Sequence, residues 1–177
     1  MVRLIAQGEE IVPAAWHTLR LLAEHLHPDG RAVHNSGTVR LFGAALELLG
    51  NTPARAEIFW QLGEGWTGDE ALAIGVYAAG AASSFEDAVR LAANHDGDSD
   101  SPASIAGQLY GARHGILAVP HAWVRRLDVL NEALEVTRRF LADAGGAGLR
   151  PTHRHAVNAL KKLADYPAAV NTVNTPV

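Results

Sequence analysis

Apolar residues recur along this chain mostly at intervals of three and four, which is the spacing of an amphipathic helix. This spacing predicts helices over residues 14–26, 38–49, 69–82, 85–94 and 123–142, another opened by Ser101 and Pro102, and a short segment from Pro53 through Trp60. No stretch shows the clear alternation of apolar and polar residues that marks a half-buried strand. The pattern therefore predicts an all-α fold, a compact bundle of several helices.

Three of the predicted helices carry further signals. Residues 69–82 are rich in alanine and carry little polar surface, so we expect this helix to be buried. Ser84 followed by Asp87 resembles a capping box at the start of the helix over 85–94. Gly107 and Gly111 lie one helical turn apart, which makes a face that lets another backbone approach closely.

The length of 177 residues suits one domain. We expect the compact helical domain to span residues 1–142. The glycine-rich stretch that follows predicts a linker, and residues 143–177 are expected to add a short helix and an extended tail.

Composition narrows the class of protein. Hydrophobic residues make up 48% of the chain and charged residues 19%, which is enough for a packed core. The net charge of −4 offers no basic surface for nucleic acid. The chain has no cysteine, which excludes disulfides, thiolate metal sites and a cysteine nucleophile. No apolar run has the length of a membrane span and no secretory signal is seen, so we expect a cytoplasmic protein that does not bind membranes.

An acidic segment precedes the helix that Ser101 and Pro102 open. Asp96, Asp98 and Asp100 alternate, and alternate side chains of an extended segment share a face. Three carboxylates on one face repel one another unless a cation neutralises them, and oxygen ligands suit Mg²⁺, Mn²⁺ or Ca²⁺. Capping explains the same residues, with Ser101 as the N-cap and the carboxylates favoured by the helix dipole. The residues alone leave both explanations open.

Three other side chains near this segment or the glycine-rich turn over 63–68 are candidates for a role. His95 stands beside the acidic segment, and we expect it to orient the loop rather than take part in chemistry. Trp66 follows two glycines, and we expect it in the core. Glu70 is either a capping carboxylate or a support for the site.

The stretch from Asn94 to Gly115 resembles the C-terminal signature of the ADP-ribosylglycohydrolase family. That signature runs Gly-Asp-(Ser/Thr)-Asp-(Ser/Thr), followed by Ala-Gly and Gly-Ala one helical turn later. Residues 62–79 resemble the family's Gly-Trp followed by Glu-Ala-Leu-Ala, and residues 83–95 resemble the helix that leads into the acidic loop. Residues 119–128 resemble the segment in which proline and tryptophan start the next helix. The resemblance spans Trp16 to Ala142.

The resemblance implies an all-α hydrolase that binds a pair of Mg²⁺ or Mn²⁺ ions and cleaves the bond joining ADP-ribose to a protein side chain. Its expected partners are an ADP-ribosylated protein or ADP-ribose. By matching positions, the implied metal ligands are Asp98, Asp100 and the hydroxyl of Ser101, with Asp96 as a further candidate. The substrate-binding candidates are Gly97, Ser99 and His95. No residue is assigned a catalytic role.

The sequence also departs from the family pattern. The family's other ligands form a Thr-Asp-Asp-Thr run in its N-terminal half, and this sequence contains no Asp-Asp pair. Asp96 stands where glycine is usual, and Pro102 where a small hydroxyl residue is common. We therefore expect a fold truncated to the family's C-terminal half, with a weak or incomplete metal site and activity that needs the N-terminal half.

The departures leave an alternative open, a non-catalytic helical domain that binds ADP-ribose or a protein partner. Cutting the family fold in half would leave a helix face uncovered. We therefore expect a homo-oligomer or a complementary partner that supplies the N-terminal half.

Overall fold

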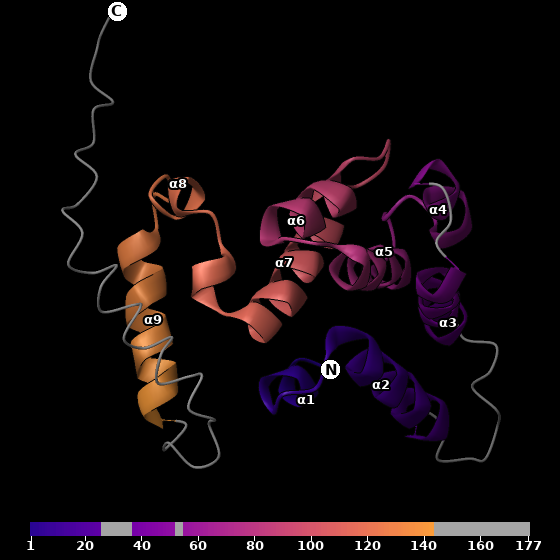
Figure 1. Cartoon of the computed structure of the whole chain (residues 1–177), viewed down its shortest axis with the longest axis horizontal. Coiled ribbons are helices and arrows are strands. Elements are labelled where there is room, and N and C mark those ends of the chain that lie inside the picture. The colour runs from indigo at the N-terminus through magenta and orange to yellow at the C-terminus, as the bar shows by residue number, and fades with distance from the viewer. Residues whose placement is uncertain (26–36, 52–54, 144–177) are drawn as a thin grey trace, which may run out of the picture. The chain divides into compact units, whose positions relative to one another are not determined.

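The computed structural model describes residues 1–25, 37–51 and 55–143 (Figure 1). Every regular element in these ranges is a helix, which confirms the predicted all-α class. The chain divides into two compact units, Met1–His114 and Gly115–Val177. The domain boundary that the sequence suggests near residue 142 stays a prediction, and residues 144–177 lie outside the described ranges. No helix in the described part of the chain is long and apolar enough to cross a membrane.

The first unit contains seven helices within its described residues: α1 (Val2–Ala6), α2 (Ile11–His25), α3 (Gly37–Asn51), α4 (Arg55–Leu62), α5 (Gly68–Ala81), α6 (Phe85–Ala93) and α7 (Asp100–His114). Helices α2, α3, α5 and α6 begin and end close to the ranges that the apolar spacing predicts. The spacing did not predict α1, because five residues are too few to show a helical period.

Helix α5 forms the centre of the first unit. It packs against α3, α6 and α7, and α6 packs in turn against α7 (Figure 1). Its buried residues lie on every side of the helix: Ala71, Ala73, Ile74, Gly75, Val76, Tyr77, Ala78 and Ala79. An all-round apolar surface is typical of a helix in a protein core, so the prediction of a buried helix is confirmed.

A glycine on α5 allows α7 to approach closely. A Cβ atom at Gly75 would lie 2.6 Å from Cγ2 of Ile105 and 3.1 Å from the carbonyl oxygen of Pro102. Both neighbours belong to α7, so a larger residue at this position would push the two helices apart. The close packing of α5 on α7 also positions the N-terminal end of α7, which carries the acidic segment.

The close backbone approach predicted at Gly107 and Gly111 is not found among the described residues. A Cβ at Gly107 would lie 3.5 Å from the ring of Phe85, and one at Gly111 would lie 3.9 Å from the same ring. These are ordinary van der Waals distances to a side chain. The ring of Phe85 on α6 covers both glycines and keeps the backbone of α6 away from them.

The second unit contains three helical elements within its described residues: η2 (Ile116–Ala118), α8 (His121–Val124) and α9 (Leu130–Asp143). The single long helix predicted over 123–142 is therefore wrong at its beginning. The N–H of Leu127 donates to the carbonyl of Val124 at 3.3 Å, three residues back, which tightens the chain into a turn. Asp128 follows, and aspartate favours turns over helix interiors.

Candidate functional site

The acidic segment before α7 is docked against the glycine-rich turn before α5. The backbone N–H of Asp98 donates to the carbonyl oxygen of Glu64 at 2.8 Å. A Cβ at Gly97 would overlap that same carbonyl, and a Cβ at Gly65 would lie 2.7 Å from the carbonyl oxygen of Asp98. Gly65 also has a φ of +83°, a conformation that favours glycine. The two loops therefore meet backbone against backbone, and glycine is needed on both sides of the contact.

The first turn of α5 fixes the glycine-rich turn. Thr67 is the N-cap of α5, and its backbone N–H donates to the Glu70 carboxylate at 3.4 Å. Gly63 has a φ of +93°, and a Cβ there would lie 2.6 Å from Cγ of Glu70. Glu70 is thus a capping carboxylate over which the turn folds, which is one of the two roles that the sequence suggested.

Two side chains of the acidic segment hold the loop itself. His95 Nδ1 accepts a hydrogen bond from the backbone N–H of Gly97 at 3.1 Å. Ser99 Oγ donates to the carbonyl oxygen of Ala93, at the end of α6, at 2.9 Å. This contact of His95 is of the loop-orienting kind that we expected, while the substrate-binding role of these residues stays a prediction.

The predicted N-cap of α7 is wrong by two positions. The helix begins at Asp100, and the first intrahelical bond runs from the N–H of Ala103 to the carbonyl of Ser99 at 3.2 Å. Ser101 therefore lies inside the first turn. Pro102 is tolerated as the third helical residue, because the first N–H groups of a helix have no intrahelical partner and proline lacks that group.

Two carboxyl groups and a hydroxyl come together at the start of α7. Hydrogen bonds from the side chain of Asp98, then from the side chain and backbone of Ser101, hold the pKa of Asp100 below its ordinary value. The hydroxyl of Ser101 donates to Oδ1 of Asp100 at 3.2 Å. Two neighbouring carboxylates repel each other unless a positive charge lies near both. A divalent cation with a preference for oxygen ligands fits the same donors.

The three aspartates do not gather as their alternation predicts. No group of three or more His, Asp or Glu side chains that could hold a metal ion occurs among the residues that the structure describes. The chain bends at residues 95–97, and Asp100 already belongs to α7, so alternate side chains do not share a face. The donors at Asp98, Asp100 and Ser101 fit a divalent cation in kind, yet an ion that takes about six ligands needs others as well.

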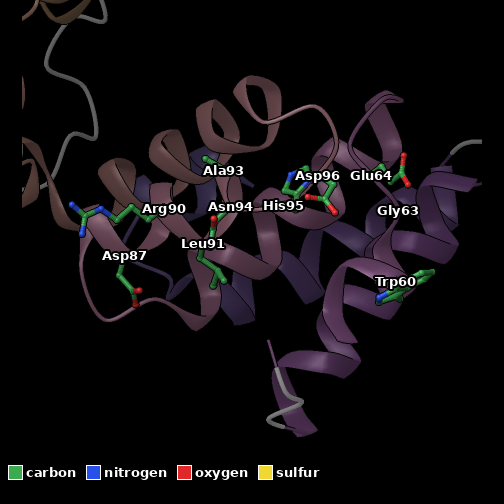
Figure 2. Close-up of a pocket in the computed structure, with 10 residues that line it drawn as sticks. All are labelled: Trp60, Gly63, Glu64, Asp87, Arg90, Leu91, Ala93, Asn94, His95 and Asp96. Atoms are coloured by element: carbon green, nitrogen blue, oxygen red, sulfur yellow. The ribbon is translucent and has the colours of Figure 1, made fainter. Parts of the chain in front are cut away.

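An open groove of about 1250 Å³ lies beside this loop (Figure 2). Its lining residues come from α4, α6 and the loops that follow them: Trp60, Gly63, Glu64, Asp87, Arg90, Leu91, Ala93, Asn94, His95 and Asp96. Of the candidate site residues, His95 and Asp96 line the groove, whereas Asp98, Asp100 and Ser101 do not. The acidic segment is thus divided: His95 and Asp96 line the groove, and Asp98 and Asp100 form the carboxyl pair at the start of α7.

Two tryptophans near the groove are exposed. The side chain of Trp60 is 91% exposed and that of Trp66 is 69% exposed. The prediction that Trp66 lies in the core is wrong, because the turn places it at the surface, where its indole N–H donates to Oε2 of Glu64 at 3.1 Å. Neither Trp60 nor Glu64 was predicted as a site residue from the sequence. The glycines on both sides of Glu64 were the available signal, since paired glycines mark a close backbone contact.

Comparison with known proteins identifies the family. Residues 1–152 match the sequence model of the ADP-ribosylglycohydrolase family. The ADP-ribosylarginine hydrolase Tri1 of Pseudomonas putida (strain GB-1) is 49% identical over 43 residues. This match covers 24% of the present chain and 12% of the relative's length. No solved structure matches the chain. Because the family match covers residues 1–152, which is most of the sequence, this chain belongs to the ADP-ribosylglycohydrolase family.

Proposed function

We propose that this chain carries part of a metal-dependent hydrolase site that cleaves the N- or O-glycosidic bond between ADP-ribose and a protein side chain. Its family membership supports the reaction class. The observation that carries the proposal is the meeting of the Asp98 and Asp100 side chains at the first turn of α7, where the Ser101 hydroxyl donates to Asp100. Arginine is the proposed acceptor, because the similar protein of Pseudomonas putida is named an ADP-ribosylarginine hydrolase.

In this proposal Asp98, Asp100 and Ser101 hold Mg²⁺ or Mn²⁺, and Asp96 is an additional ligand candidate from the groove side of the loop. A divalent ion bound there supplies a Lewis acid for the ribose and an activated water at neutral pH. The N–H groups in the first turn of α7 suit a phosphate of ADP-ribose, because a helix N-terminus favours negative charge. Gly97 and Ser99 keep the loop in place beside the substrate, and His95 fixes their geometry.

The remaining ligands come, in this proposal, from a segment with the family's Thr-Asp-Asp-Thr run, which this sequence does not contain. Two carboxylates and one hydroxyl bind a divalent ion weakly, because affinity rises with ligand number and charge. A complementary N-terminal half that carries this run would complete the site. The lack of cysteine suits the reducing cytoplasm, which is the proposed location.

Calorimetric titration of ADP-ribose into the protein, with and without Mn²⁺, tests the proposal. We expect binding that needs Mn²⁺ and that is lost in the double variant Asp98→Asn/Asp100→Asn. The control variant Glu24→Gln/Glu47→Gln removes two exposed carboxylates from α2 and α3, and it should bind like the parent protein. Failure of the parent protein to bind ADP-ribose with Mn²⁺ present would contradict the proposal. Release of ADP-ribose from ADP-ribosylarginine, measured with the complementary half added, then tests turnover.

The second candidate is a non-catalytic domain that binds ADP-ribose or a protein partner. The observation that favours it is the lack of a third carboxylate or imidazole at the Asp98–Asp100 pair among the described residues. This candidate predicts ADP-ribose binding that is the same with and without Mn²⁺. It also predicts that Asp98→Asn/Asp100→Asn leaves that binding intact, so one titration separates the two.

A further inference from the structure

We propose that the groove between α4 and α6 binds the acceptor arginine and the peptide segment around it. In this arrangement the guanidinium lies against Trp60 and the carboxylates of Glu64 and Asp96. This inference rests on the proposed function, since it concerns the protein side of an ADP-ribosylated substrate. It involves neither the ligands proposed at Asp98, Asp100 and Ser101 nor the ADP-ribose moiety.

The size of the groove suits a peptide. Its volume of about 1250 Å³ lies above the range of about 300–1000 Å³ that is typical of small-molecule pockets. Figure 2 shows Trp60 on the α4 side, Leu91 on the α6 side and Asp96 on the loop that follows α6. The groove therefore offers an aromatic face, an apolar wall and a carboxylate to one occupant, as a side chain with an apolar stem and a polar head requires.

The charges that line the groove favour a cation. Three acidic residues line it, Glu64, Asp87 and Asp96, against one arginine, Arg90. The guanidinium of Arg90 is already paired with Glu86, 2.6 Å away. The acidic side chains therefore dominate the field in the groove, and a phosphate-bearing ligand would be repelled there. This charge favours the arginine side of the substrate over its ADP-ribose moiety as the occupant.

Glu64 and Asp96 lie on neighbouring stretches of backbone. Gly97, next to Asp96, packs on the carbonyl of Glu64, and the amide of Asp98 is bonded to that carbonyl. The docked loops thus bring the two acidic residues to one end of the groove. Glu64 uses Oε2 for the indole N–H of Trp66, and this bond fixes the orientation of its carboxylate. A carboxylate held in this way is prepared to accept two N–H groups from a planar guanidinium.

Trp60 distinguishes arginine from lysine. Its side chain is 91% exposed, so its indole face is open to a partner. A guanidinium stacks on an indole face through its flat surface and still donates hydrogen bonds from its edge, whereas an ammonium group lacks the flat surface. The combination of an indole face with two carboxylates is therefore matched to arginine.

Fluorescence anisotropy with a short labelled peptide containing arginine tests this inference, without metal or ADP-ribose in the solution. Matched peptides carry citrulline or lysine in place of arginine. We expect saturable binding of the arginine peptide, about tenfold weaker binding of the neutral citrulline peptide, and weaker binding of the lysine peptide. Trp60→Ala should weaken the arginine peptide about two- to fivefold.

The charge variants Glu64→Gln and Asp96→Asn should each weaken binding of the arginine peptide, while Glu47→Gln on α3 should not. Glutamine at position 64 still offers an oxygen to the Trp66 indole, so the turn should keep its fold. Equal affinity for the arginine and citrulline peptides, or an equal loss in Glu47→Gln, would overturn the inference. So would the absence of saturable binding.

The same assay separates this inference from the proposed hydrolase function. Asp98 and Asp100 do not line the groove, so Asp98→Asn/Asp100→Asn should lose metal-dependent ADP-ribose binding and keep the arginine peptide. If the protein binds no metal and still binds the peptide as expected, the proposed function fails and the groove assignment stands. If it binds Mn²⁺ and ADP-ribose but does not prefer the arginine peptide, only the groove assignment fails.

Discussion

The backbone amide of Asp98 donates to the carbonyl oxygen of Glu64 at 2.8 Å, and this bond joins the loop before α7 to the turn before α5. Both partners are main-chain atoms, so the bond needs no particular side chain at either position. The bond requires that the two backbones approach closely, and Gly65 and Gly97 allow this because they have no Cβ atom. The bond fixes the base of the carboxyl pair at Asp98 and Asp100, and it also brings Glu64 to the groove that Asp96 lines.

Gly97→Ala should disrupt the contact between the two loops. The added Cβ would overlap the carbonyl of Glu64, and neither backbone can move without breaking the bond to Asp98. We expect a loss of about 1–3 kcal/mol in the free energy of unfolding, measured with urea. In the control Gly50→Ala, the Cβ meets no described atom within 4 Å, so that variant should be unchanged or more stable by up to about 1 kcal/mol. A Gly97→Ala protein as stable as its parent would refute the docking of the loops.

Gly75→Ala and Gly107→Ala should have different effects although both glycines lie in helices. At Gly75 the new Cβ would lie 2.6 Å from Ile105, so α5 and α7 must separate, at a cost of about 1–3 kcal/mol. At Gly107 the nearest atom is 3.5 Å away, and alanine favours the helix. Thermal unfolding of the two variants should show a lower midpoint only for Gly75→Ala. The reverse order would mean that α7 packs through its glycine face instead.

Ser84→Ala should destabilise α6 by about 1 kcal/mol, because Ser84 Oγ accepts the N–H of Asp87 at 3.0 Å as the N-cap of that helix. Ser104→Ala is the matched control, since Ser104 lies inside α7 and alanine is the better helix former. Urea unfolding measures both. Equal effects of the two substitutions would show that the cap contributes nothing.

The ion pair between Glu10 and Arg113 predicts a pH-dependent stability. A hydrogen bond from Arg113, with its charge as a further cause, holds the pKa of Glu10 below its ordinary value of 4.5, and the pair joins the start of α2 to the end of α7. A carboxyl with a lowered pKa in the folded protein adds stability above its unfolded pKa, and that stability is lost as the pH falls through the folded pKa. Glu10→Gln should therefore be less stable than the parent protein at pH 7, and the difference should shrink as the pH falls well below 4.5.

The urea midpoint of both proteins, measured at intervals across this pH range, checks this dependence. The aspartates at 69 and 100, whose pKa values are also lowered, act equally in both proteins and cancel in the comparison. A difference in midpoint that stays constant with pH would mean that the Glu10 side chain acts through packing and not through its charge.

Local signals in the sequence were sufficient for most helices. The alanine-rich composition of α5 predicted its burial, because a helix that is apolar all round beyond its first turn has no polar face to present to water. The Ser84–Asp87 pair predicted the start of α6 through a hydrogen bond between residues three apart. Such signals involve only residues close together in the sequence, so they can be recognised before the structure is known.

The geometry of the candidate site could not be predicted from the sequence, because it depends on contacts between distant segments. Glu64 and Asp98 are far apart in the sequence, and their bond uses backbone atoms, which leave no side-chain signature. The alternation of the three aspartates suggested a shared face, but the bend at 95–97 and the early start of α7 divided them between the groove and the carboxyl pair. Trp66, which follows the glycine-rich turn, was expected in the core, yet its N–H is bonded at the surface to Glu64.

The most direct test of the central claim is a titration of Mn²⁺ followed by electron paramagnetic resonance, in which only free Mn²⁺ gives the full signal. The account predicts that the parent protein and Glu24→Gln/Glu47→Gln both remove Mn²⁺ from solution to the same extent. It also predicts that Asp98→Asn/Asp100→Asn binds at least about tenfold more weakly, because two charged ligands are lost. Identical free Mn²⁺ signals for all three proteins would show that the carboxyl pair at the start of α7 is not a metal site.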